Sequence, residues 1–201
     1  MLEIDSVAER LTAARDDRYA EVLEGVDAHA AAHGCGMEIP SAAETRMLSV
    51  LVRATRATYV LEIGGGIGYS ALHMTASFGQ TGRLDVVEPN PVHATLIQEH
   101  ARRFALAERI RVQNAAATSV VMALSGPYDL IAIHAEYVDE CGSLFETLMR
   151  LLRVGGSLVV LAGRDRGLDG EASLLAERLA EDPRVWPAFS EHGGMMAARV
   201  R

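Results

Sequence analysis

Residues Val60–Ser70 read VLEIGGGIGYS, and this stretch decides the fold that the rest of the chain is expected to adopt. An apolar, β-prone run, Tyr59–Ile63, ends at a glycine-rich turn, residues 64–68, and a helix is predicted from Tyr69. Glycine allows the backbone to come close to a ligand because it has no side chain. Ligands of open α/β sheets bind beyond the carboxyl ends of the strands. The stretch therefore predicts a ligand site at this turn.

The spacing of the glycines separates two classes of cofactor. In the dinucleotide fingerprint GxGxxG counted from Gly64, the third glycine would fall on Tyr69, which disfavours an NAD-linked oxidoreductase. The stretch instead follows acid-x-Gly-x-Gly-x-Gly, with Glu62, Gly64, Gly66 and Gly68 at the defined positions. S-adenosylmethionine has no pyrophosphate to cradle, and its amino group and sulfonium favour an acid beside the turn. We therefore expect this cofactor, with Glu62 facing its amino group directly or through water.

A second acid supports the same interpretation. Glu88 stands 20 residues after Gly68, at the end of the next predicted strand, Arg83–Glu88. A carboxylate at this position can accept hydrogen bonds from both hydroxyl groups of a ribose. Glu88 is therefore predicted to bind the sugar of the cofactor.

Strands and helices alternate from the turn onward, which predicts a parallel sheet covered on both faces. The five strands are expected at Tyr59–Ile63, Arg83–Glu88, Ile110–Gln113, Asp129–His134 and Ser157–Ala162. The helices between and after them are expected at Tyr69–Phe78, Pro91–Ala107, Ala117–Leu124, Gly142–Leu152 and Glu171–Glu181.

The two ends of the chain differ from this alternation. Strands predicted at Arg184–Ser190 and Met195–Val200 are joined by only four residues, which favours an antiparallel hairpin. Helices are predicted at Val7–Arg15, at Tyr19–His33 and from Ser41 to Thr55. Ser41 and Glu44 have the spacing of a capping box.

Length and composition indicate one α/β domain, with residues 1–55 as a helical cap and residues 56–201 as a Rossmann-like core. The net charge of −8 and the interrupted arginine clusters favour a small-molecule substrate over nucleic acid. No apolar run approaches the ~20 residues of a membrane span, and no signal peptide is evident. We therefore expect a cytoplasmic protein that does not bind membranes. Cys35 and Cys141 form no CxxC pair and are expected to be reduced thiols, neither a zinc site nor a disulfide framework.

Six motifs in order resemble one known family, the catechol and caffeoyl-CoA O-methyltransferases of the class I S-adenosylmethionine-dependent type. They are LEIGGGIGYSAL, VVEPNP, ERIRVQNAAA, YDLIAIHAEY, LLRVGGSLVV and DPRVWPAFSEHGGMMAARV. The resemblance extends from about Gly36 to Arg201. It implies a Rossmann-like methyltransferase fold with a seven-stranded, mostly parallel sheet, and a homodimer.

The resemblance also implies roles for particular residues. It places Glu62, Gly64, Gly65 and Ser70 at the methionine end of the cofactor and Glu88 at the ribose. Ala116 and Ala117 fall in the loop beside the adenine, which reads Gly-Asp-Ala in the family but Ala-Ala-Ala here. The missing acid removes one adenine contact and leaves the backbone amides.

The positions that bind a divalent cation in the family are changed. The resemblance places the first metal aspartate at His134 and the following Asp-Asn pair at Leu161 and Ala162. Tyr137 stands where the family often has a lysine, and Glu136 remains as a single carboxylate. Magnesium requires hard oxygen ligands. We therefore expect no metal-binding residues at this site and no metal cofactor.

Without a metal, a phenol with a pKa near ~10 needs a side-chain base to remove its proton. His134, at the end of the fourth predicted strand and expected to face the cofactor's methyl group, is the candidate for this catalytic role. The alternative is that His134 only fills the former metal position. His29 and His33 have a metal-ligand spacing of i, i+4, but without a carboxylate motif a solvated helix face is favoured.

Three functions follow from these residues. The leading expectation is a metal-independent O-methyltransferase for a small hydroxylated molecule. An N-methyltransferase is the second, because a neutral amine needs little help in losing a proton. The third is a catalytically silent protein that binds S-adenosylmethionine or its product, S-adenosylhomocysteine.

Overall fold

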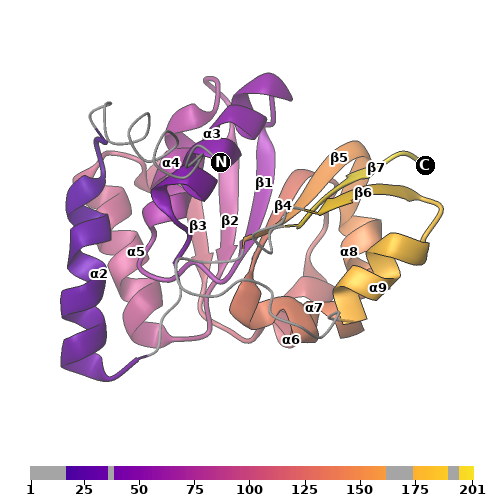
Figure 1. Ribbon diagram of the computed structural model, residues 1–201. Coiled ribbons are helices and arrows are strands. Elements are labelled where there is room, and N and C mark those ends of the chain that lie inside the picture. Colours follow the sequence, from indigo (N-terminus) through magenta and orange to yellow (C-terminus); the bar gives the residue numbers. More distant parts are fainter. Residues whose placement is uncertain (1–16, 36–38, 162–173, 190–194) are drawn as a thin grey trace, which may run out of the picture.

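The computed structural model describes residues 17–35, 39–161, 174–189 and 195–201, and its centre is a seven-stranded sheet (Figure 1). The strand order is β3-β2-β1-β4-β5-β7-β6. Strands β1 to β5 pair in parallel, whereas β7 pairs antiparallel with both β5 and β6. The predicted fold class, a mostly parallel Rossmann-like sheet with an antiparallel C-terminal pair, is confirmed.

The bounds of most elements lie close to the predicted ranges. The strands are β1 (Tyr59–Ile63), β2 (Arg83–Val87), β3 (Ile110–Gln113), β4 (Tyr128–His134), β5 (Leu152–Leu161), β6 (Val185–Phe189) and β7 (Met195–Arg199). The helices are α2 (Ala20–His33), α3 (Ala42–Ala54), α4 (Tyr69–Ser77), α5 (Pro91–Arg103), α6 (Ala117–Val120), α7 (Val138–Ser143), α8 (Phe145–Leu151) and α9 (Leu174–Glu181). The helix predicted at Val7–Arg15 lies outside the described residues. Within the described part of the chain, we find no helix with both the length and the apolar character of a membrane span.

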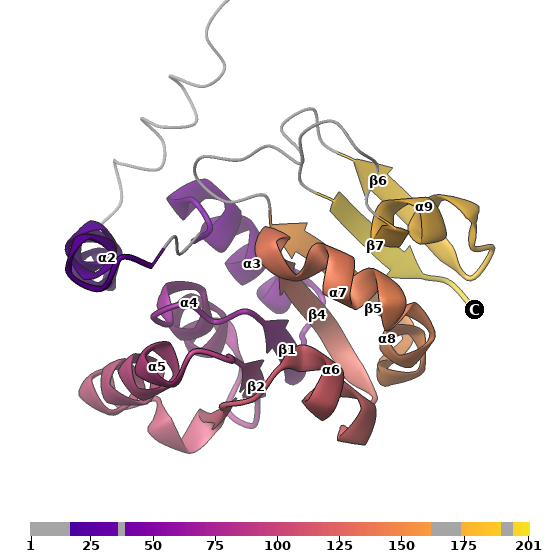
Figure 2. The same cartoon turned by 90° about the horizontal axis from the view of Figure 1, so that it is seen from below.

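Successive residues of the central strands point to opposite faces of the sheet. Leu61 faces a core built with α6, α7, α8 and α9, whereas Val60 and Leu130 face a core built with α3, α4 and α5. Figure 2 shows α4 and α5 on one side of the central strands and α6, α7 and α8 on the other. The alternation places Glu62 and His134 on the same side as Val60 and Leu130, at the carboxyl ends of β1 and β4.

The helix before β1 begins with the predicted capping box. The backbone N–H of Ser41 donates to Oε2 of Glu44 at 2.8 Å, and the N–H of Glu44 donates to Oγ of Ser41 at 3.2 Å. These two bonds satisfy donors that a helix start otherwise leaves unpaired. They fix the start of α3, which packs against α4 and against the face of the sheet that contains Val60 and Leu130.

The region between β4 and β5 departs from the prediction. One helix was expected over Gly142–Leu152, but the chain forms α7 and α8 with a break at Leu144, whose N–H donates to the carbonyl of Cys141 at 3.0 Å. Strand β5 then begins at Leu152 and passes through Gly155, which has φ +77°. Glycine adopts such a conformation without strain, so the strand begins before the predicted Ser157 and is irregular until regular pairing with β4 starts at that residue.

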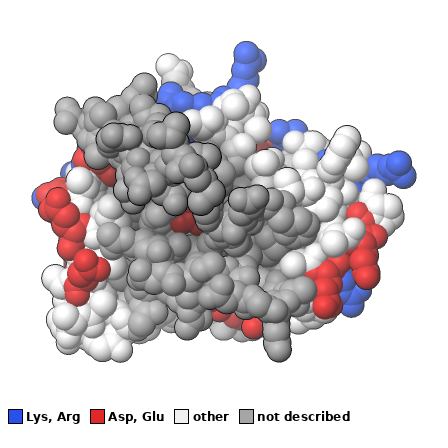
Figure 3. Space-filling view, viewed as in Figure 1, with Lys and Arg blue, Asp and Glu red and all other residues white. Residues whose placement is uncertain are grey.

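Helix α2 packs beside the glycine-rich turn. Tyr19, Val22 and Val26 form a buried cluster with Ile67 of the turn and Leu72 of α4. Figure 1 shows α2 alongside α5 at the edge of the molecule. Its outer face carries exposed acids, and Figure 3 shows acidic side chains at this edge. The described part of the N-terminal segment thus packs on the core, and a single domain over residues 1–201 stays a prediction.

Candidate active site

Glu62 stands at the centre of a buried polar group between β1, α4 and β4. Its carboxylate atom Oε1 accepts a hydrogen bond from Oγ of Ser70 at 2.5 Å and lies 3.1 Å from Nε2 of His134. Both Glu62 and His134 are buried. The second carboxylate atom, Oε2, is buried and has no hydrogen-bond partner among the described residues. Glu62 therefore retains an acceptor atom that a ligand could use.

The charge of Glu62 changes the acidity of His134. Burial by itself lowers the pKa of the imidazole, but the hydrogen bond and charge of Glu62, with the charges of Glu136 and Glu88, outweigh burial. The pKa of His134 is therefore raised above its ordinary value of 6.5. A histidine in this setting takes up a proton more readily than one in water.

Glu88 directly follows β2 and points into the glycine-rich turn. Its Oε2 accepts the backbone N–H groups of Gly65 and Gly66, each at 3.0 Å, and its Oε1 accepts the N–H of Asn90 at 2.9 Å. Burial raises the pKa of Glu88, and these three amides oppose that shift. The sequence predicted that Glu88 and the glycine-rich turn bind the same cofactor, and in the structure the two are in direct contact.

Two glycines of the turn lie too close to other residues to carry a side chain. A Cβ on Gly64, which has φ +86°, would lie 2.4 Å from Cε2 of Tyr137. A Cβ on Gly65 would lie 2.5 Å from Cγ1 of Val86. Tyr137 thus covers the turn from the loop after β4. Burial and neighbouring acids raise the pKa of its phenol, so the hydroxyl group stays protonated at neutral pH.

The loop after β3 lies beside Glu88. Asn114 donates from Nδ2 to the carbonyl oxygen of Glu88 at 2.9 Å, a link that the sequence did not predict. Ala116 directly precedes α6, and Ala117 is buried in that helix. The loop that the family resemblance assigned to the adenine therefore borders the residue that it assigned to the ribose.

The strand register brings together two of the positions that the family resemblance assigned to a metal. His134 of β4 is the direct partner of Leu161 of β5, at the carboxyl ends of both strands. Leu161 is buried, and Ala162 lies outside the described residues. Separate roles were predicted for Glu62 and His134, and their contact was not predicted. The available signal was their position on the same side of adjacent strands.

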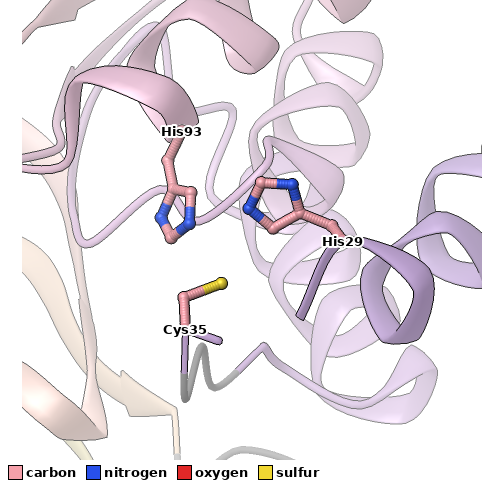
Figure 4. Close-up of side chains that lie close together, drawn as sticks. All are labelled: His29, Cys35 and His93. Carbon is pink, nitrogen blue, oxygen red and sulfur yellow. The ribbon is translucent and has the colours of Figure 1, made fainter. Parts of the chain in front are cut away.

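One further group of side chains was missed. His29, Cys35 and His93 come together between α2 and α5 (Figure 4), although the sequence analysis favoured a solvated face for His29 and a plain thiol for Cys35. Their separation along the chain explains the omission, because only the packing of α2 beside α5 brings them close.

Comparisons with known proteins agree with this geometry. A family model described as O-methyltransferase matches residues 11–189. A relative from Mycobacterium sp. (strain KMS), assigned as an O-methyltransferase, is 34% identical over 165 residues, which cover 76% of this chain and 74% of the relative. The catechol O-methyltransferase of Mycobacterium tuberculosis is 27% identical over 208 residues, which cover 99% of this chain and 88% of that protein.

Solved structures support the fold. The O-methyltransferase from Bacillus cereus in complex with SAH has a TM-score of 0.79 at 21% identity, covering 98% of this chain and 97% of that one. The O-methyltransferase TomG from Streptomyces achromogenes in complex with SAM has a TM-score of 0.80 at 19% identity, with 100% of both chains covered. From the family match, the relatives and the shared fold, we conclude that the chain belongs to the S-adenosylmethionine-dependent O-methyltransferase family.

Proposed function

We propose that this enzyme methylates a hydroxyl group of a small molecule without a divalent cation at the acceptor, and that His134 is the base. The observation that carries the proposal is the contact between His134 and Glu62, 3.1 Å between Nε2 and Oε1, at the carboxyl end of β4. An imidazole held by a buried carboxylate stands where the family resemblance places a metal aspartate.

The residues around the turn fit the cofactor. The buried Oε2 of Glu62 suits the amino group of the methionine part, because an unpaired buried acceptor is costly unless a donor meets it. Glu88 suits the ribose hydroxyls. When bound, S-adenosylmethionine supplies an electrophilic methyl group on a sulfonium. The proposed cofactor-binding residues, all near the carboxyl ends of the central strands, are Glu62, Gly64, Gly65, Gly66, Ser70, Glu88, Ala116, Ala117 and His134.

The side chains at the former metal positions do not suit magnesium. His134 offers a nitrogen that already contacts Glu62, and its register partner Leu161 offers only hydrocarbon. Glu136 is one exposed carboxylate in the following loop. Magnesium prefers octahedral oxygen ligation with one or more carboxylates. The proposed mechanism therefore contains no step in which magnesium takes part.

His134 can carry the proton instead. With Nε2 donating to Glu62, the neutral ring has its lone pair on Nδ1, which accepts the proton of the acceptor hydroxyl group. Glu62 then stabilises the imidazolium that forms, as the carboxylate of a catalytic triad does. General base catalysis of this kind contributes about 10²- to 10⁴-fold to the rate.

A screen of acceptors tests the class of reaction. Phenols, catechols and aliphatic alcohols are compared with amines, using methyl-labelled cofactor, with and without added Mg²⁺. We expect label on the hydroxylated acceptors and the same turnover in both conditions. Label on amines alone would indicate an N-methyltransferase, and binding of S-adenosylhomocysteine without any turnover would indicate a silent binding protein. Stimulation by Mg²⁺ would overturn the metal-free mechanism.

The variant His134→Gln tests the base. Glutamine keeps a hydrogen-bond donor for Glu62 but cannot accept the proton at neutral pH. We expect kcat to fall about 10²- to 10⁴-fold, and the affinity for S-adenosylhomocysteine, to which His134 also contributes a contact, to fall by much less. A kcat within a few-fold of the wild type in the folded variant would exclude His134 as the base.

A further inference from the structure

Two imidazoles and a thiol meet beside the glycine-rich turn, outside the group of residues assigned to methyl transfer. They belong to His29 of α2, Cys35 just after that helix, and His93 of α5 (Figure 4). One ligand atom from each side chain lies within 4.8 Å of those of the other two. The rings of His29 and His93 contact each other, with centroids 5.0 Å apart.

The ends of two helices hold these side chains in place. Helix α2 ends at Gly34, which has φ +63° and donates its N–H to the carbonyl of Ala30, so the chain reverses and Cys35 returns toward the helix. At the start of α5, the side chain of Asn90 accepts the N–H of His93 at 3.4 Å, and His93 is buried. The cluster is therefore built from fixed helix ends.

The orientation of the rings leaves nitrogen atoms directed into the cluster. Nε2 of His29 is buried and has no hydrogen-bond partner among the described residues. In Figure 4, one ring nitrogen of each histidine points toward the space above the sulfur of Cys35. An unpaired buried nitrogen aimed at a second imidazole and a thiol is an unfavourable arrangement unless a common partner lies between them.

The donor set selects the kind of partner. Zinc binds histidine nitrogen at about 2.1 Å and thiolate sulfur at about 2.3 Å, with ligand atoms about 3.5 Å apart in a tetrahedron. The three ligand atoms lie within 4.8 Å of one another, so metal binding would draw them closer together. Magnesium and calcium prefer oxygen, so this set favours a borderline-soft transition metal.

We propose that His29, Cys35 and His93 bind a divalent transition metal of the zinc class, with water as the fourth ligand. Binding releases the thiol proton to solvent and leaves the site with a net charge of +1. The metal would link the end of α2 to the first turn of α5. This site is separate from the former magnesium position, which lies at His134.

Two surrounding features support the proposal. The carboxylate atom Oε1 of Glu88 lies 3.6 Å from Nδ1 of His93 and can orient a metal-bound imidazole. Nε2 of His93 then binds the metal and gives up its 3.4 Å contact with Nδ2 of Asn90. Burial, with nearby histidines, lowers the pKa values of His29 and His93, so both rings are neutral at neutral pH and need not lose a proton before binding.

Cobalt binding to the untagged full-length chain tests the site. Metal is first removed with a chelator, and the chelator is then removed before Co²⁺ is added. We expect one Co²⁺ per chain, a thiolate-to-cobalt charge-transfer band in the near ultraviolet, and displacement by Zn²⁺ but not by Mg²⁺. The absence of stoichiometric Co²⁺ binding, or of the thiolate band, would overturn the proposal.

Variants assign the ligands. Cys35→Ser is expected to abolish the thiolate band, and Cys35→Ser and His29→Ala each to weaken metal binding on the order of 100-fold or more. Cys141→Ala is the matched control, because this second cysteine is a buried residue of α7 and should leave the band unchanged. Circular dichroism checks that each variant is folded. A band that persists in Cys35→Ser, or that is lost in Cys141→Ala, would contradict the assignment.

Discussion

At the scale of single residues, substituting Glu88 tests whether its carboxylate binds the cofactor or only stabilises the fold. It holds the amides of Gly65 and Gly66, and we propose that it binds the ribose. Hydrogen bonds to a charged group are worth about 1.5–3 kcal/mol, so Glu88→Gln should weaken S-adenosylhomocysteine binding roughly 10- to 100-fold. Isothermal titration calorimetry measures this change.

The control for Glu88 is a buried carboxylate in the strand that precedes it, β2. Asp85 accepts the hydroxyl groups of Tyr59 and Tyr128 at 2.9 and 2.7 Å, away from the turn. Asp85→Asn should lower stability and leave the affinity for S-adenosylhomocysteine unchanged. Equal loss of affinity in both variants would show that Glu88 acts only through the fold.

The raised pKa of His134 predicts how stability depends on pH. Because the folded-state pKa lies above the unfolded value, the stabilisation is fully present below the unfolded pKa and is lost as pH rises through the folded pKa. The stability advantage of the wild type over His134→Gln should therefore shrink as the pH rises from the ordinary histidine pKa of 6.5 through the raised folded-state pKa, by at most about 1.4 kcal/mol per pH unit. Urea denaturation across this range measures it. An advantage that grows with pH would show that the pKa is lowered instead.

The sequence predicted the positions of individual residues better than their contacts. Glu62 and Glu88 could be placed at strand ends from local patterns alone. The contact between His134 and Glu62 depends on which strands are neighbours, and the meeting of Cys35 with His93 depends on the packing of α2. Neither kind of information is local in the sequence.

At the scale of secondary structure, the capping box of α3 gives a direct test. Ser41→Ala removes the acceptor for the N–H of Glu44 and should lower the free energy of unfolding by about 1 kcal/mol. Ser49→Ala in the same helix is the control. Among the residues that the structure describes, the Ser49 hydroxyl donates to the helix carbonyl of Thr45, so its loss should change stability by less than about 0.5 kcal/mol. Similar losses in both variants would contradict the capping role.

The elements with strong periodicity or a capping signal were predicted correctly, and those governed by tertiary packing were not. Strand β1 and the start of α3 match their predicted ranges. The break at Leu144, whose N–H donates to the carbonyl of Cys141, was not predicted, although Gly142 lies two residues before it. Strand β5 begins at Leu152 and not at the predicted Ser157, and it includes Gly155 in an irregular stretch before regular pairing with β4.

At the scale of the whole molecule, the homodimer implied by the family resemblance stays a prediction. Strand β6 is the last strand of the sheet, and its Trp186 is 75% exposed. Sedimentation equilibrium is expected to give twice the chain mass of 21.6 kDa. Since the chain has one tryptophan, its emission on dilution reports whether the dimer covers this edge. A single species of 21.6 kDa at all concentrations would exclude the dimer.

The sheet class could be predicted because fully apolar strands alternating with helices have few other ways to bury their surfaces. The packing of α2 beside α5 could not be predicted, because the pattern of an amphipathic helix does not specify which neighbouring element it covers. The proposed metal site depends on that packing and therefore emerges only at the level of the whole molecule.

The register of β4 and β5 has an evolutionary consequence. His134 and Leu161 are direct partners, so two point mutations on adjacent strands would place two acidic side chains next to each other without rebuilding a loop. If His134 is the base that we propose, such a pair of changes could replace an imidazole with carboxylate ligands for a cation. Glu88 and the glycine-rich turn that it holds would stay as they are, because they lie at the end of a different strand, β2.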